Sequence, residues 1–133
     1  MSIYTSNIMK AVIAALKSDS QVSALIGDRV FTHVQQNCAF PYVAIRSFSA
    51  PYDTKTEDGT ETTLRIHVYS EYEGAAQVLD VLSKVHTALH KQQLTVEGAN
   101  LVNLRYDGGG DAEPEPDGKR WQGFVDFRSV CTN

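Results

Sequence analysis

The sequence predicts an α+β fold, a two-layer sandwich in which a mainly antiparallel sheet of about four to five strands carries two amphipathic helices on one face. Two stretches near residues 6–17 and 74–90 place apolar residues at three- and four-residue steps, which is typical of amphipathic helices. Residues 62–69 instead alternate apolar and polar side chains, which indicates a half-buried strand. Strands that follow one another through short connections favour antiparallel pairing.

The N-terminal third predicts two helices and a strand. Thr5 or Ser6 can cap the first helix. Ser20 can cap a short second helix, and Gly27 suits the left-handed position that ends one. A strand begins at 30–31. The apolar stripe of the first helix consists of Ile8, Met9, Val12, Ile13 and Leu16.

The middle third predicts two strands and the second long helix. The first strand covers 42–48 and is opened by Pro41, where a missing N–H group is tolerated. Residues 49–60 are polar and turn-rich, which predicts a long loop before the strand at 62–69. The helix spans about 74–90, and its apolar face is formed by Ala75, Val78, Leu79, Leu82, Val85, His86 and Leu89.

The C-terminal third predicts further strands. Two of them, 94–96 and 101–106, flank a turn at Gly98, and the last covers 120–130. Between the last two strands, residues 107–118 are polar and rich in glycine and proline. They predict a mobile hairpin tip.

Length and charge set broad limits on function. The 133 residues predict a single domain over 1–133. The net charge of −4, with 12 basic residues scattered among 16 acidic ones, argues against a general nucleic-acid binder. No apolar run approaches the ~20 residues of a membrane span, and the N-terminus lacks the pattern of a secretory signal. We therefore expect a cytosolic protein whose Cys38 and Cys131 are reduced.

No motif for catalysis or cofactor binding is complete in the sequence. His86 and His90 have the four-residue spacing of two metal ligands, but the glutamate of a metalloprotease helix is missing and no third ligand is implied. Gly108–Gly110 is followed by acidic residues, which would repel phosphate. No serine or cysteine lies in a nucleophile motif. We expect no enzymatic activity, no metal and no cofactor.

Two polar segments are candidate contact sites. The loop that contains Asp53, Thr54, Lys55, Glu57 and Asp58 is either an ordinary exposed excursion or an arm that makes an intersubunit contact. The acidic tip that contains Asp107, Asp111, Glu113, Glu115 and Asp117 is a solvated loop, a docking or channel-facing loop, or a metal site. The spacing of these acids fails the calcium-loop pattern.

Several segments, taken in order, resemble the tail-completion (tail-terminator) proteins of long-tailed bacteriophages. The similarity covers nearly the whole chain, and the long acidic tip is the main departure. The matching segments are Ala14-Ala15-Leu16-Lys17, Leu25-Ile26-Gly27-Asp28-Arg29-Val30, Phe40-Pro41-Tyr42-Val43, the Gly59 turn before His67-Val68-Tyr69-Ser70, and Leu101-Val102-Asn103-Leu104.

The resemblance implies a structural virion protein at the head–tail junction, assembled in the host bacterial cytoplasm. Such proteins form a ring of six on the tail tube protein, stop tail polymerisation and present a surface to the head-side connector protein. They have no known catalytic step, and DNA passes through the channel without specific binding. The alternatives are another head–tail connector or tube-like phage protein, or a small-ligand-binding or enzymatic α+β domain with a concave apolar pocket.

Overall fold

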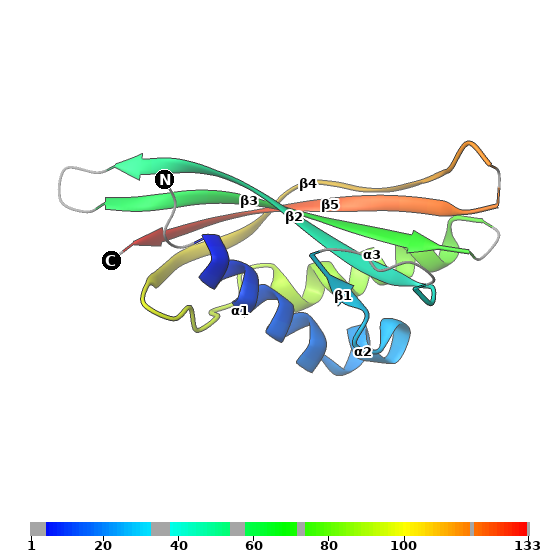
Figure 1. Ribbon diagram of the computed structural model, residues 1–133, viewed down its shortest axis with the longest axis horizontal. Helices are drawn as coiled ribbons and strands as arrows, with labels where there is room; N and C mark the ends of the chain where they lie inside the picture. The colour runs from blue at the N-terminus through cyan, green and yellow to red at the C-terminus, as the bar shows by residue number, and fades with distance from the viewer. Residues whose placement is uncertain (1–4, 33–37, 54–57, 72–73, 118, 133) are drawn as a thin grey trace.

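A twisted five-stranded sheet forms one layer of the computed structural model, and three helices form the other (Figure 1). The structure describes residues 5–32, 38–53, 58–71, 74–117 and 119–132. The strands lie in the order β1-β2-β3-β5-β4, and all neighbours are antiparallel except β1 and β2. The elements are α1 (Thr5–Ser18), α2 (Ser20–Ile26), β1 (Val30–Phe31), β2 (Tyr42–Asp53), β3 (Asp58–Ser70), α3 (Ala76–Leu89), β4 (Asn100–Pro114) and β5 (Trp121–Thr132).

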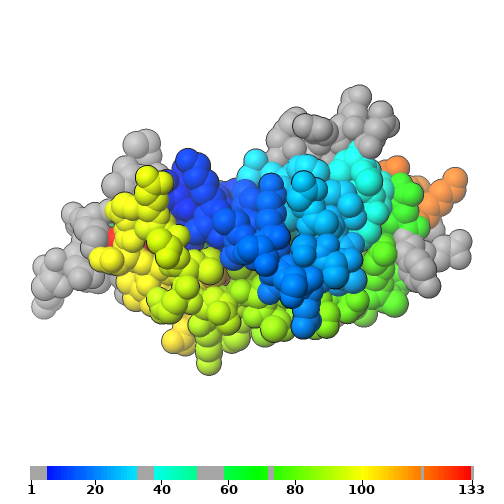
Figure 2. Space-filling model, turned by 90° about the horizontal axis from the view of Figure 1, so that it is seen from below, coloured from blue at the N-terminus to red at the C-terminus, as the bar shows by residue number. Residues whose placement is uncertain are grey.

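The helices cover one face of the sheet, and the core lies between the two layers. Figure 2 shows α1, α2 and α3 side by side over this face. Phe127 is the largest fully buried side chain and lies on β5 near the middle of the core. The stripe predicted for α1 is confirmed at its buried members, Ile8, Val12 and Leu16. The predicted α+β sandwich is therefore confirmed.

The strand β3 has the alternation that its sequence predicts. Leu64, Ile66 and Val68 are fully buried against the helices, while Arg65 and His67 lie on the opposite face and are partly exposed. β3 pairs with β2 along one side and with β5 along the other. These two ladders fix which residues of three long strands share the outer face.

The long loop predicted for residues 49–60 is wrong. β2 continues to Asp53 and β3 begins at Asp58, and these two residues are paired. The polar side chains do not prevent this, because the backbone of Gly59 and Thr60 also bonds to the end of β5. The Ser49 and Thr62 hydroxyls are 3.0 Å apart in a cross-strand hydrogen bond.

The mobile tip predicted for residues 107–118 is also wrong over most of its length. β4 continues to Pro114, which pairs with Trp121, so the connection shortens to the residues between these two. The register shifts between Tyr106 and Gly108 and again between Gly109 and Ala112. Positive φ angles of 132°, 80° and 118° at three consecutive glycines allow the strand to bulge and still pair. The two hairpins lie at opposite ends of the sheet (Figure 1).

Two smaller expectations are corrected by local backbone geometry. Asp19 rather than Ser20 caps α2, because its Oδ1 accepts hydrogen bonds from the N–H groups of Gln21 and Val22. The strand predicted at 94–96 is an irregular segment, in which Val96 packs into the core and its carbonyl accepts a turn hydrogen bond from Ala99. Apolar residues alone do not make a strand where no partner strand is aligned with them.

We predict that Gly109→Ala destabilises the protein more than Gly108→Ala. Both glycines have positive φ, but a Cβ at Gly109 would lie 2.5 Å from the Phe124 carbonyl oxygen, whereas one at Gly108 would have no heavy atom within 4 Å. Backbone strain alone should lower the free energy of unfolding by about 1 kcal/mol in Gly108→Ala, and the added clash should give about 3 kcal/mol in Gly109→Ala. Urea denaturation measures both, and equal losses would contradict the close approach of β4 to β5.

Candidate assembly surfaces

The outer face of the sheet carries an ordered group of aromatic and charged side chains. Tyr42 stacks on Tyr69 with ring centroids 5.0 Å apart, and the His67 ring lies 6.0 Å from Tyr69 and 6.1 Å from Phe124. These residues occupy paired positions on β2, β3 and β5. The cross-strand register therefore builds one continuous aromatic row, and burial raises the pKa of both tyrosines.

Arg65 contacts both an acidic and an aromatic side chain of β5 on this face. Its Nε and Nη2 donate to the two carboxylate oxygens of Asp126 at 2.9 and 3.1 Å, and its guanidinium lies 4.3 Å from the centre of the Phe124 ring. A bidentate pair of this kind fixes the orientation of both side chains. The hydrogen bonds that Arg65 donates to Asp126 raise the pKa of Arg65 above its already high ordinary value, so its side chain remains positively charged.

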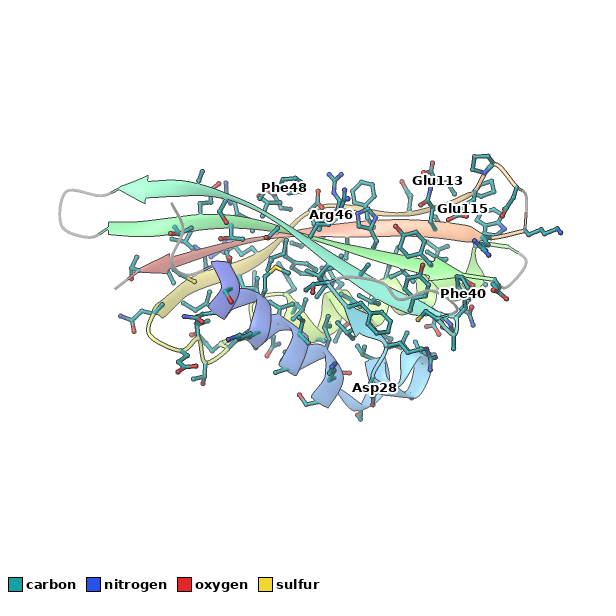
Figure 3. All side chains as sticks on the ribbon, in the orientation of Figure 1. Asp28, Phe40, Arg46, Phe48, Glu113 and Glu115 are labelled. Carbon is teal, nitrogen blue, oxygen red and sulfur yellow. The ribbon has the colours of Figure 1, made fainter. Side chains whose placement is uncertain are left out.

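The free edge of β2 presents a cation and an apolar ring on the outer face. Among the described residues, β1 pairs with β2 only at Val43 and Ala44, so β2 has no described neighbour on this side from Ile45 onward. Arg46 and Phe48 project from this edge strand, away from the helices (Figure 3). Phe48 is 56% exposed, and Arg46 forms no ion pair with any residue that the structure describes.

A groove lies at the other edge of the sheet, between α3 and the bulged part of β4. It has a volume of about 380 Å³ and is lined by residues that include Leu79, His86, Tyr106 and Asp111. Leu79 and Tyr106 are each 42% exposed. The bulge opens the groove because β4 bends where its register shifts, and the Tyr106 hydroxyl donates to the carbonyl of Gly109 across the bend.

His86 and His90, the two histidines with metal-ligand spacing, contact each other and Tyr106. The His86 ring stacks on that of His90 with centroids 4.8 Å apart, and it meets the Tyr106 ring edge to face at 5.2 Å. His90 Nδ1 accepts a hydrogen bond from the Tyr106 N–H group at 3.0 Å. Over the described part of the chain, no three His, Cys, Asp or Glu side chains gather closely enough to hold a metal ion.

The predicted acidic site is distributed along a hairpin rather than gathered in one tip. Asp107, Asp111 and Glu113 are exposed on β4, and Asp111 lies at the groove. Glu115 and Asp117 lie in the connection between β4 and β5. Figure 3 shows Glu113 and Glu115 together at this end of the sheet. Asp117 accepts hydrogen bonds from the N–H groups of Lys119 and Arg120, which lower its pKa. These five acidic residues are therefore spread along the end of β4 and the connection that follows it.

The predicted contact loop is described only at its base. Asp53 ends β2 and Asp58 begins β3, opposite each other in the ladder. Thr54, Lys55 and Glu57 lie outside the described residues. The paired ends of β2 and β3 lie at the end of the sheet opposite the β4–β5 hairpin (Figure 1).

Both cysteines are free thiols. Cys38 is partly exposed, and its Sγ donates weakly to the Ala39 carbonyl at 3.4 Å. Cys131 is buried in the core on β5, where burial raises the pKa of its thiol. The burial of Cys131 agrees with a packing role for this thiol. Within the described ranges, none of the helices has the length and hydropathy needed to cross a membrane.

Several surface residues were missed by the sequence analysis. Leu79 was predicted on the buried face of its helix, but it lies at the edge of that face, where the bulge in β4 leaves it uncovered. Arg46 and Phe48 were also not predicted to form a contact surface. The available signal was an apolar ring at Phe48 on the same side of the strand as Arg46, a position where a half-buried strand places polar residues.

We predict that His67 makes the protein less stable in mild acid. Burial, followed by the charges of Arg65 and Arg46, lowers the pKa of His67 below its ordinary 6.5, while Asp126 opposes the shift. The unfolded chain therefore binds this proton at a higher pH than the folded chain. Stability should therefore fall as the pH drops through 6.5, the ordinary histidine pKa that applies to the unfolded chain.

The difference in free energy of unfolding between wild type and His67→Gln measures this contribution, because titrations common to both chains cancel. The wild type should lose stability relative to the variant as the pH falls. A difference that is independent of pH would contradict the lowered pKa.

Comparisons with known proteins agree with this architecture. A chain in the solved virion of a native gene transfer agent particle superposes with a TM-score of 0.91 at 21% sequence identity, covering 100% of both chains. At this identity the likeness shows a shared fold. No curated protein matches the chain. The family model of tail completion protein gp17 matches residues 10–132. The chain therefore belongs to the tail completion protein gp17 family.

Proposed function

We propose that this protein caps the tail tube as a ring, stops tail polymerisation and provides the surface for head–tail joining. The observation that carries the proposal is the family match, which extends over residues 10–132 and includes every strand of the sheet. The shared fold with a chain of a gene transfer agent virion supports the same structural role.

The two unlike edges of the sheet support a ring. One edge presents Arg46 and Phe48, and the other presents the groove beside Leu79 and Tyr106. Unlike surfaces on one subunit favour head-to-tail contacts, and such contacts close into a ring when the rotation between subunits allows it. Six copies would follow the pattern of the family that the sequence resembles.

Termination requires that the two sides of the ring differ. One side would bind the last ring of the tail tube protein, and the other would bind the head-side connector protein while refusing another tube subunit. The hairpins at opposite ends of the sheet are suited to these two roles, and we assign Asp53, Thr54, Lys55, Glu57 and Asp58 to a contact with the tube or a neighbouring subunit.

The acidic hairpin suits a channel that DNA crosses without binding. At −4 per chain, a ring of six carries −24. Placed toward the channel, the end of the β4–β5 hairpin with Glu115 and Asp117 would repel the DNA backbone and prevent adhesion during ejection. Glu113 lies at this same end of the sheet (Figure 3). Asp107 and Asp111 lie further from it, and docking to a protein is the alternative role for them.

A small-ligand or enzymatic domain is the competing interpretation. Small-ligand sites bury most of the ligand surface in a concave pocket. The groove beside α3 is open to solvent, and the metal and nucleophile motifs tested above are not completed. These features favour a protein partner.

We predict that deleting the gene from the parent phage or prophage yields overlong tails, or filled heads beside unattached tails, in electron micrographs of lysates. The physical reason is that a tube without its cap keeps an end that accepts further subunits. Supplying the wild-type gene in trans should restore normal particles. Infectious particles with normal tails in the deletion strain would reject the proposed function.

A further inference from the structure

The exposed apolar side chains point to a specific contact. Among the described residues, four large hydrophobic side chains are exposed: Phe48, Leu79, Val102 and Tyr106. Leu79 and Tyr106 line the same groove, at one edge of the sheet. Phe48 lies on β2, near the opposite edge. One chain therefore carries an exposed aromatic ring at one edge of its sheet and, at the other edge, an open groove with a mixed polar and apolar lining.

The charges beside these two features are complementary. Arg46 lies two residues before Phe48 on the same face of β2 and forms no ion pair with another described residue. Asp111 lines the groove, is exposed and likewise forms no ion pair within the described part of the chain. A contact that places Phe48 in the groove would bring a cation next to an anion on the rim.

We propose that a second copy of this chain docks on the groove, with its Phe48 between Leu79 and Tyr106 and its Arg46 near Asp111. The proposal rests on the ring of the proposed function and identifies the contact that would build it. Because the two surfaces differ, each copy uses one edge as donor and the other as acceptor, and the contact repeats around the ring.

A second copy is favoured over another occupant by the pairing of shape and charge. The groove of about 380 Å³ is open along the sheet edge, so a side chain carried on a neighbouring strand can reach it. Central aromatic side chains that fill a pocket usually dominate interface affinity, and a rim ion pair adds orientation and specificity.

The test compares self-association of the full chain and of exposed-site variants by sedimentation velocity up to about 1 mM. We expect the wild type to associate, and Phe48→Asp and Leu79→Asp each to weaken association by about 30-fold or more. Val102→Asp is the matched control, since Val102 is 51% exposed but lies outside the groove lining. Circular dichroism should show the same folded spectrum for all variants.

Mixing the two defective variants tests the direction of the contact. Phe48→Asp retains an intact groove, and Leu79→Asp retains an intact Phe48, so the mixture should form dimers that do not extend. Reversing the charges singly, as Arg46→Asp or Asp111→Arg, should weaken association by about tenfold, and combining both reversals in one chain should restore it.

Three results would overturn the inference. The first is a wild-type chain that stays monomeric at about 1 mM, which means a dissociation constant weaker than about 1 mM. The second is that the Phe48 and Leu79 variants associate as well as Val102→Asp does, and the third is that the mixture of the two variants forms no dimer. None of these would remove the proposed function, which depends on the tail phenotype of the deletion strain. Conversely, normal tails without the gene would reject the capping role and leave this contact measurable.

Discussion

The pairing of β3 with both β2 and β5 is the constraint on which the rest of the structure depends. It places Leu64, Ile66 and Val68 against the helices and Arg65 and His67 on the opposite face. A shift of one residue in either ladder would exchange the two sets and destroy the core. The bidentate contact of Arg65 with Asp126 and the aromatic row exist only in this register. Core and outer surface are therefore specified together.

The bulged end of β4 adds a second feature to this framework. Consecutive glycines with positive φ let the strand change register twice and still pair with β5 as far as Pro114. Beside this bulged segment, Leu79 of α3 and Tyr106 of β4 line a groove and are exposed. At the opposite edge, β1 is short, so the side of β2 that faces away from β3 lacks a described partner strand over most of its length. Two different local effects thus give the sheet two unlike edges, and this asymmetry supports the head-to-tail ring that we propose.

Side-chain pattern alone was sufficient to predict the layers, the three helices and the alternation of β3. It failed where the backbone ladder rather than side-chain hydrophobicity determines the structure. Residues 49–60 and 107–118 are polar, yet β5 provides a partner for the start of β3 and for most of β4. The acidic residues were found because charge is visible in the sequence. Arg46, Phe48 and Leu79 were missed because their exposure depends on which strand lies at an edge and where β4 bends.

The central proposal is that this chain forms a closed ring between the tail tube and the head. Electron cryomicroscopy of intact particles tests it most directly. We expect one ring of this chain on the last ring of the tail tube, with the helices and sheet of the present structure in every subunit. Density for the chain at the distal end of the tail, within the head shell or in a repeating stack along the tube would contradict it.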